Sequence, residues 1–121
     1  MVNVLKKLRE RLTTSTTDLD AQKLRAFCAT RTNCTPIGDL QPRQKAEVVG
    51  QITTVRIVPH VGSPWLEATL VDGTGTMVVM WTGRRRIPGI TPGRRLALIG
   101  RAGKFGSSRR LVVYNPAYEL L

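Results

Sequence analysis

The most constraining feature of the sequence is a Gly-rich tetrad, Asp72-Gly73-Thr74-Gly75, which separates two segments patterned like β-strands. Residues 65–71 alternate apolar and polar side chains, and residues 76–82 form a β-branched and aromatic run. An Asp-Gly pair tolerates positive φ at low cost, and the second glycine allows a bulge, so the tetrad suits the twist of paired strands. The pattern therefore predicts a β-hairpin, with an irregular acidic loop as the alternative.

Three further strands are predicted at regular spacing around this hairpin. Residues 47–58 form a long first strand, in which Gly50 indicates a bulge or a sharp bend where a sheet curls. Residues 94–103 and 109–114 form the fourth and fifth strands, joined by a Gly-Ser loop over 104–108. Five strands with a bent first member can close a small barrel and remove exposed edges. The predicted class is mainly β, a five-stranded OB-fold barrel with one or two short N-terminal α-helices.

The chain is expected to divide near Pro36 into an N-terminal helical extension, residues 1–35, and an OB-fold barrel, residues 36–121. Apolar residues at helical spacing predict a short basic helix at the start of the extension. Asp18 is a plausible N-cap for a second helix over residues 19–29. Helices this short are not stable alone, so each is expected to dock on the barrel, on another chain or on the ligand.

The composition sets the size of the core and the charge of the partner. With 121 residues, of which 41% are hydrophobic, the chain can bury one modest core, so a single domain is expected. Nineteen Lys and Arg residues against eight Asp and Glu residues give a formal net charge of +11. Self-repulsion on this scale opposes folding, and a polyanionic partner accounts for it. The alternative is that the arginines follow genome composition and only maintain solubility.

Basic residues gather at the predicted loops and strand ends, which favours a phosphate chain as the ligand. Guanidinium groups bind phosphate oxygens through paired hydrogen bonds, and release of condensed counterions gives affinity without base specificity. Clustered arginines with no nearby acid favour a polyanion over a merely solvated surface. The basic candidates for nucleic-acid contact are Arg56, Arg84, Arg85, Arg86, Arg94, Arg95, Lys104, Arg109 and Arg110.

Aromatic residues complete the candidate site, although they make up only 5% of the chain. Base stacking on a protein ring contributes about 1–3 kcal/mol per base in single-strand binding. Trp65 and Phe105 are the better stacking candidates, because Phe105 lies on a Gly-rich loop where packing does not explain it. Trp81 is also a candidate, with burial in the core as the alternative. Tyr114 and Tyr118 are more typical of residues that anchor a terminus.

The sequence gives little support for catalysis, a metal site or a cofactor. The acids are dispersed, and the single histidine, His60, has no recognisable nucleophile partner, so no enzyme activity is expected. Cys28 and Cys34 are too few for a zinc site or a disulfide framework, which predicts a reduced, cytoplasmic chain. A bridge between them is the alternative in an oxidising compartment. Neither a membrane span nor a secretory signal is expected.

Short segments that follow one another in a fixed order along residues 37–120 carry a family resemblance. They are Ile37-Gly38-Asp39-Leu40, Val48-Val49-Gly50-Gln51-Ile52, Val71-Asp72-Gly73-Thr74-Gly75, Val79-Met80-Trp81, Pro92-Gly93-Arg94-Arg95-Leu96, Ile99-Gly100-Arg101 and Asn115-Pro116-Ala117-Tyr118-Glu119-Leu120. This order resembles the OB-fold nucleic-acid-binding family, especially the wedge domain of RecG helicases and small stand-alone bacterial OB-fold proteins. The resemblance implies an OB fold that contacts nucleic acid through its barrel face and loops. The phosphate loop of helicase motors has no match, so translocation and ATP hydrolysis are not implied.

These observations predict a nucleic-acid-binding module. Single-stranded or branched DNA is the expected partner, favoured over RNA and bound largely independently of sequence. The alternative is a protein-interaction OB module that recruits another factor, with the N-terminal helices docking in a groove. A membrane-surface role for the basic helix is the least favoured, because its apolar face is small and lacks aromatic residues.

Overall fold

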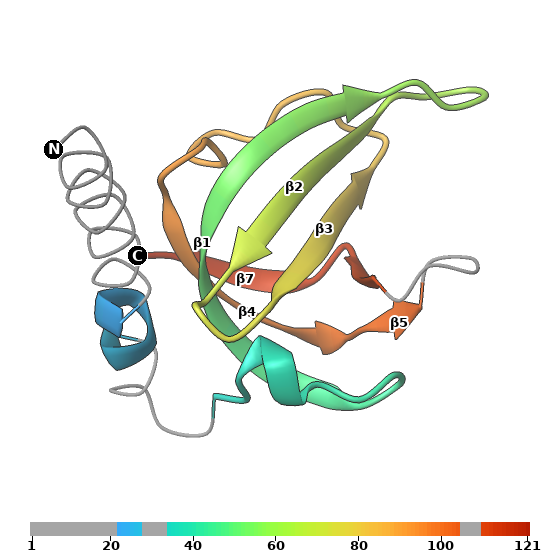
Figure 1. The fold of residues 1–121 in the computed structure, drawn as a ribbon. Helices are drawn as coiled ribbons and strands as arrows, with labels where there is room; N and C mark the ends of the chain where they lie inside the picture. The colour runs from blue at the N-terminus through green and yellow to red at the C-terminus, as the bar shows by residue number, and fades with distance from the viewer. Residues whose placement is uncertain (1–21, 28–33, 105–109) are drawn as a thin grey trace, which may run out of the picture.

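The computed structural model describes residues 22–27, 34–104 and 110–121. Seven strands form one strongly curled, mixed sheet in the order β5-β6-β3-β2-β1-β4-β7 (Figure 1). The elements are η1, a 3₁₀ helix (Ile37–Asp39), β1 (Lys45–Val58), β2 (Trp65–Val71), β3 (Thr76–Thr82), β4 (Arg95–Arg101), β5 (Gly103–Lys104), β6 (Leu111–Tyr114) and β7 (Ala117–Leu120). The predicted mainly β class is confirmed. No helix within the described ranges is both long and apolar enough to cross a membrane.

The predicted hairpin is present with the predicted strand limits. Strands β2 and β3 pair antiparallel, from Trp65 opposite Thr82 to Val71 opposite Thr76. The turn between them is held by the buried carboxylate of Asp72. The sheet also contains one parallel pair, β3 with β6, in addition to its antiparallel pairs.

Asp72 holds the hairpin turn and joins it to η1. Its carboxylate is 2% exposed. Oδ1 accepts hydrogen bonds from the backbone N–H groups of Thr74 (2.9 Å) and Gly75 (3.1 Å), and Oδ2 accepts one from Ile37 N–H (2.8 Å). Gly38 N–H donates to Thr74 Oγ1 at 3.0 Å. These hydrogen bonds give Asp72 a structural role, because both carboxylate oxygens are engaged by the turn and by η1.

The strand count differs from the prediction, because the described residues form seven strands, and the sheet is not closed by a continuous ladder. The predicted fourth strand is broken in two, and a further strand follows the predicted fifth. Ala102 separates β4 from β5, and Asn115 and Pro116 separate β6 from β7. Proline has no N–H for a ladder, and Asn115 has a positive φ of 46°.

The segment that contains β4 and β5 runs beside the segment that contains β6 and β7. Strand β4 pairs antiparallel with β7, with Ile99 opposite Ala117, and β5 pairs antiparallel with β6, with Gly103 opposite Val112. The register moves by one residue between the two ladders. They are therefore two parts of one interrupted antiparallel pairing, which gives the sheet its barrel-like curl. Strand β7, which lies beyond Pro116, was not predicted.

The long first strand changes partner at Gln51, which pairs with Val71 on β2 and with Arg95 on β4. The irregularity in the β1–β2 register falls between residues 52 and 54, so the bulge predicted as one alternative at Gly50 is not at that residue. Gly50 has a different role. A Cβ atom there would lie 2.8 Å from Leu70 Cγ and from the Val71 carbonyl oxygen. Glycine is therefore needed for the close approach of β2 to the bend of β1.

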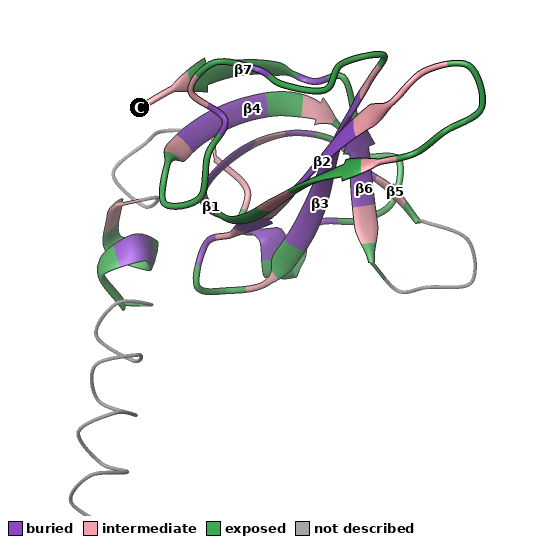
Figure 2. Cartoon of the chain, turned by 90° about the horizontal axis from the view of Figure 1, so that it is seen from above, coloured by how far each residue is buried: buried purple, intermediate pink, exposed green. Residues whose placement is uncertain are grey.

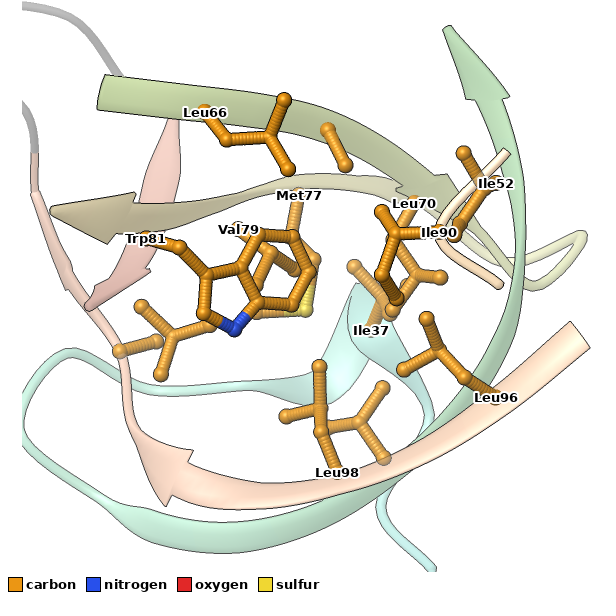
Figure 3. Close-up of a cluster of buried hydrophobic side chains, with 14 of the residues drawn as sticks. Ile37, Ile52, Leu66, Leu70, Met77, Val79, Trp81, Ile90, Leu96 and Leu98 are labelled. Carbon is orange, nitrogen blue, oxygen red and sulfur yellow. The ribbon is translucent and has the colours of Figure 1, made fainter. Parts of the chain in front are cut away.

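The inner face of the sheet carries one hydrophobic core (Figures 2 and 3). Burial of each large apolar side chain contributes roughly 1.5–3 kcal/mol relative to exposure. Leu70, Val79 and Leu96 are completely buried, and Ile87 and Ile90 from the β3–β4 connection cover one side of the cluster. The core residues labelled in Figure 3 are Ile37, Ile52, Leu66, Leu70, Met77, Val79, Trp81, Ile90, Leu96 and Leu98.

The predicted N-terminal helices fall partly outside the described residues. Residues 22–27 are helical, within the predicted range 19–29. Leu24 is 6% exposed, and the guanidinium carbon of Arg95 lies 4.5 Å above the ring centroid of Phe27. This segment lies beside the C-terminus in Figure 1. Three predicted features lie outside the described residues. They are the first helix, the N-cap Asp18 of the second helix, and Cys28.

Candidate functional site

The outer surface of the hairpin and its two neighbouring strands forms a distinct face. Because side chains alternate along a strand, residues beside the core positions Leu66 and Ala68 point outward. Strand pairing aligns these outward residues in rows across the sheet. We use the name β2–β3–β6 face for the surface formed by Arg56, Trp65, Glu67, Val78, Met80, Val112 and Tyr114.

An apolar floor underlies this face. Val78, Met80 and Val112 are between 2% and 5% exposed and form a second hydrophobic cluster, separate from the core. Trp65 packs against this cluster and is half-buried. The floor holds the aromatic residues above it in defined positions.

Three aromatic rings lie together on the β2–β3–β6 face and its adjoining loop. The ring of Trp65 stacks on that of His60, with centroids 4.0 Å apart and an interplanar angle of 10°. Tyr114 meets Trp65 edge to face, with centroids 6.1 Å apart. His60 is exposed, and Tyr114 is 46% exposed. These rings, here called the aromatic column, present surfaces on which a flat molecule can stack.

The column changes the ranking of the predicted aromatic residues. Trp65 lies on the face as predicted, but one side of its ring is covered by His60. His60 and Tyr114 are the more exposed members, and the sequence analysis assigned neither to the site. The sequence held one signal for placing His60 near Trp65, because only a short loop bounded by prolines separates the two residues. Nothing in the sequence indicated the parallel pairing that places Tyr114 opposite Met80.

A hollow opens beside the column. It has a volume of about 610 Å³ and is lined by Ile57, Pro59, His60, Gly62, Ser63, Pro64 and Arg85. Most of these residues belong to the β1–β2 loop, whereas Arg85 comes from the connection that follows β3. Apolar surface is exposed here, because Ile57 near the end of β1 is 55% exposed and Val61 in the loop is 96% exposed. The hollow thus combines a ring, apolar surface and one guanidinium group.

The predicted basic residues do not form a single cluster. Arg84, Arg85 and Arg86 are exposed, and Arg85 lines the hollow. Arg95 is opposite Gln51, which is about 20 Å along β1 from Ile57, and its guanidinium group packs on Phe27. Arg94 precedes it and is exposed. Of the arginines on the predicted loops that the structure describes, Arg85 in the Arg84–Arg86 connection is the one that lines the hollow beside the aromatic column.

The remaining predicted residues lie elsewhere or outside the described ranges. Lys104 is exposed and pairs with Leu111, at the opposite end of β6 from Tyr114. Arg110 is exposed next to it. Phe105 and Arg109 fall in residues 105–109, outside the described part of the chain, so their predicted roles stay predictions.

Arg56 lies on the β2–β3–β6 face, but it is not an isolated positive charge. Its Nε–H donates to Glu67 Oε2 in an ion pair across β1 and β2. The side chain of Arg56 is 73% exposed, whereas that of Glu67 is 11% exposed. Glu67 therefore neutralises part of the positive charge of Arg56.

Trp81 is removed from the candidate site. It points to the inner face of the sheet and is 4% exposed (Figure 3). Its ring meets Tyr118 edge to face, with centroids 5.7 Å apart. The prediction of Trp81 as a base-stacking residue is wrong, because Trp81 is a buried member of the hydrophobic core, as the burial alternative expected. Among the described residues, no group of three or more His, Cys, Asp or Glu side chains could hold a metal ion.

Comparison with known proteins identifies the fold. No protein-family model and no curated protein sequence matches the chain. The fold is similar to part of RecG in its structure bound to a three-way DNA junction, with a TM-score of 0.62 and 19% identity. That match covers 75% of this chain and 13% of the RecG chain, so the chain spans a small part of RecG's length.

Two archaeal domains show the same likeness. The OB domain of MM0293 from Methanosarcina mazei matches with a TM-score of 0.56 and 17% identity, over 73% of this chain and 82% of that domain. The second OB-fold domain of replication protein A from Methanococcus maripaludis matches with a TM-score of 0.50 and 15% identity, over 69% and 91%. The expected OB fold is confirmed.

Proposed function

We propose that the protein is a nucleic-acid-binding OB module that holds single-stranded or branched DNA, largely independently of sequence. The observation that carries this proposal is the aromatic column of His60, Trp65 and Tyr114 beside the basic Arg84–Arg86 connection. Stacking on exposed rings tolerates any base, and guanidinium groups bind the phosphates. Together they provide the two kinds of contact that single-strand binding needs.

The position of the column supports the same proposal. OB folds bind oligonucleotides on the face of their second and third strands and through the loops beside it. Here that face and the β1–β2 loop carry the rings, the hollow and Arg85. One structural neighbour is RecG bound to a DNA junction, and another is a domain of replication protein A, which favours DNA over RNA as the partner.

We also propose that the module acts by binding alone, without catalysis and without a cofactor. The acidic residues Asp72 and Glu67 are engaged by the turn and by Arg56. A cytoplasmic location stays a prediction based on the low cysteine content.

A salt titration of oligonucleotide binding tests the proposal. Single-stranded, duplex and forked DNA of matched sequence are compared with single-stranded RNA, and tryptophan fluorescence reports binding. Trp65 on the face is expected to respond, whereas buried Trp81 provides a constant background. The logarithm of the association constant should fall linearly with the logarithm of salt concentration, by about 0.7 per contacted phosphate on a single strand. Binding that ignores salt, or no binding at low salt, contradicts the proposal.

The alternative function is a protein-interaction OB module, and one feature of the opposite side favours it. A hollow of about 200 Å³ lies over β1, β4 and β7, beside Ile99 and Tyr118, which are 45% and 38% exposed. Exposed apolar residues around a hollow are typical of protein contact sites. Salt-insensitive behaviour in the titration above would favour this alternative.

A further inference from the structure

The ion pair between Arg56 and Glu67 lies at the β1 end of the candidate binding face. The two residues are direct cross-strand partners, and the same row continues through Met80 on β3 to Tyr114 on β6. Trp65 precedes Glu67 by two positions and so points to the same side of β2. This polar pair therefore borders an aromatic and apolar surface and lies close to a base stacked at Trp65.

The geometry of the pair leaves one edge of the guanidinium group available. Arg56 uses its Nε–H for the carboxylate of Glu67. The two terminal nitrogens carry the other N–H donors, arranged as a planar fork. With 73% of the Arg56 side chain exposed, this fork faces the solvent side of the sheet.

Glu67 holds the fork in place. Its side chain is 11% exposed, and Glu67 is the cross-strand neighbour of the buried Met80. A long arginine normally loses side-chain freedom when it binds, and a preformed partner reduces that loss. The fork is therefore pre-organised before a ligand arrives.

Guanine is the base that matches this fork. It presents two adjacent acceptors, O6 and N7, to which arginine donates two parallel hydrogen bonds. Thymine has no two adjacent acceptors, cytosine has adjacent acceptors, O2 and N3, only on its Watson–Crick edge, and adenine has an amino donor beside N7. In a single strand this edge of the base is accessible, because the base is not paired.

We infer that the Arg56–Glu67 pair is a guanine-reading site, which adds a base preference to a face that otherwise binds through stacking and phosphate contacts. This inference depends on the proposed function. Arg56 is the diagonal neighbour of Trp65 across β1 and β2, a separation of about 7–8 Å that long side chains span. A guanine stacked at the aromatic column, or the nucleotide beside it, lies within reach of the fork.

The test compares three oligonucleotides of equal length. One contains thymidine only, the second has a single central guanine, and the third has 7-deazaguanine at that place, which lacks N7. The unaltered protein should bind the guanine oligonucleotide about tenfold more tightly than oligothymidine. The 7-deazaguanine oligonucleotide should lose most of this advantage.

Two substitutions connect the preference to the pair. Arg56→Lys keeps the charge but removes the fork, so affinity for the guanine oligonucleotide should fall about tenfold while that for oligothymidine changes little. Glu67→Gln keeps the side-chain volume and should lose part of the preference. Arg101→Lys is the matched control and should leave the preference unchanged. Arg101 lies on β4, away from this face, and donates to the Arg43 carbonyl oxygen.

The outcomes separate the inference from the proposed function. Equal binding of guanine and thymidine oligonucleotides, or of guanine and 7-deazaguanine, would show that the pair is only a cross-strand ion pair, while leaving the proposed function intact. Absence of salt-dependent binding to all three would overturn the proposed function and the inference with it. The 7-deazaguanine comparison uses the unaltered protein, so it decides the question even where a substitution unfolds the chain.

Discussion

The two loops at the ends of β2 are built in opposite ways. The turn after β2 is centred on Asp72, whose buried carboxylate accepts hydrogen bonds from the turn and from η1. The loop before β2, residues 59–64, is mostly exposed, with Val61 96% exposed at its tip. The described backbone bond within it, from Ser63 N–H to the His60 carbonyl oxygen, is long at 3.3 Å.

This difference indicates how one strand serves stability at one end and binding at the other. A buried carboxylate satisfied by backbone donors fixes the hairpin register and attaches η1 to the barrel. An exposed loop with apolar side chains contributes little to folding and has surface available for a ligand. We therefore expect substitutions at the Asp72 turn to change unfolding, and substitutions around the loop to change binding.

Asp72→Ala should have the largest effect. It removes the acceptor for three backbone N–H groups, one of which belongs to the buried residue Ile37. The free energy of unfolding should fall by about 3 kcal/mol. Urea unfolding followed by tryptophan fluorescence measures the change. Asp39→Ala is the control, because Asp39 is exposed on η1 and should alter stability by less than about 0.5 kcal/mol. Equal effects of the two substitutions would refute the structural role given to the turn.

Gly38→Ala should have the next largest effect, because it tests the contact between the turn and η1. A Cβ atom at Gly38 would lie 2.8 Å from the carbonyl oxygen of Thr74, which is backbone and cannot rotate away. The free energy of unfolding should fall by about 1–3 kcal/mol. Gly103→Ala is a comparison on the same sheet, since nothing lies within 4 Å of the added atom. A larger loss at Gly103 than at Gly38 would show that η1 does not depend on this close approach.

The turn end of the molecule could be predicted from sequence because its signals are local. The Asp72-Gly73-Thr74-Gly75 tetrad and the alternation on each side determine a hairpin over a few neighbouring residues, and the structure confirms its limits. Strand β7 was missed for the converse reason. Pro116 separates it from β6, and only its pairing with β4, far away in the sequence, defines it as a strand.

The binding end was predicted less well, because it depends on contacts between distant segments. Trp81 and Trp65 lie on strands of similar composition. Trp81 is in the core and Trp65 is on the surface because their side chains point to opposite faces of the sheet. The basic residues were chosen for being adjacent in sequence. The curl of β1 separates Arg95 from Arg85, and the Arg56–Glu67 pair exists only through the β1–β2 register.

Tyr114→Ala should produce the largest change in binding without a matching change in stability. Tyr114 is 46% exposed at one end of the aromatic column, so single-strand affinity should fall about tenfold. Tyr118→Ala is the matched control. Tyr118 has similar exposure, at 38%, but contacts Trp81 at the core, so its loss should lower stability by about 1 kcal/mol and leave affinity unchanged. The reverse pattern would move the binding site to the β4–β7 side.

Arg85→Ala should have a smaller effect, visible in the salt dependence. Arg85 borders the hollow beside the β1–β2 loop, so its removal should reduce the salt slope by about 0.7, the value for one phosphate on a single strand. Arg94→Ala removes an exposed arginine of the same charge at the start of β4 and should leave the slope unchanged. Equal changes for both would indicate that net charge, rather than position, controls binding.

Val61→Ser should have the smallest effect on stability and tests the exposed end of the comparison directly. The side chain is 96% exposed, so folding buries almost none of its apolar surface, and the free energy of unfolding should change by less than about 0.5 kcal/mol. The same urea titration used for Asp72→Ala measures it. A loss above about 1 kcal/mol would mean that the loop tip packs in solution. In that case the loop before β2 would support the fold as the Asp72 turn does, and the division between a stabilising end and a binding end would fail.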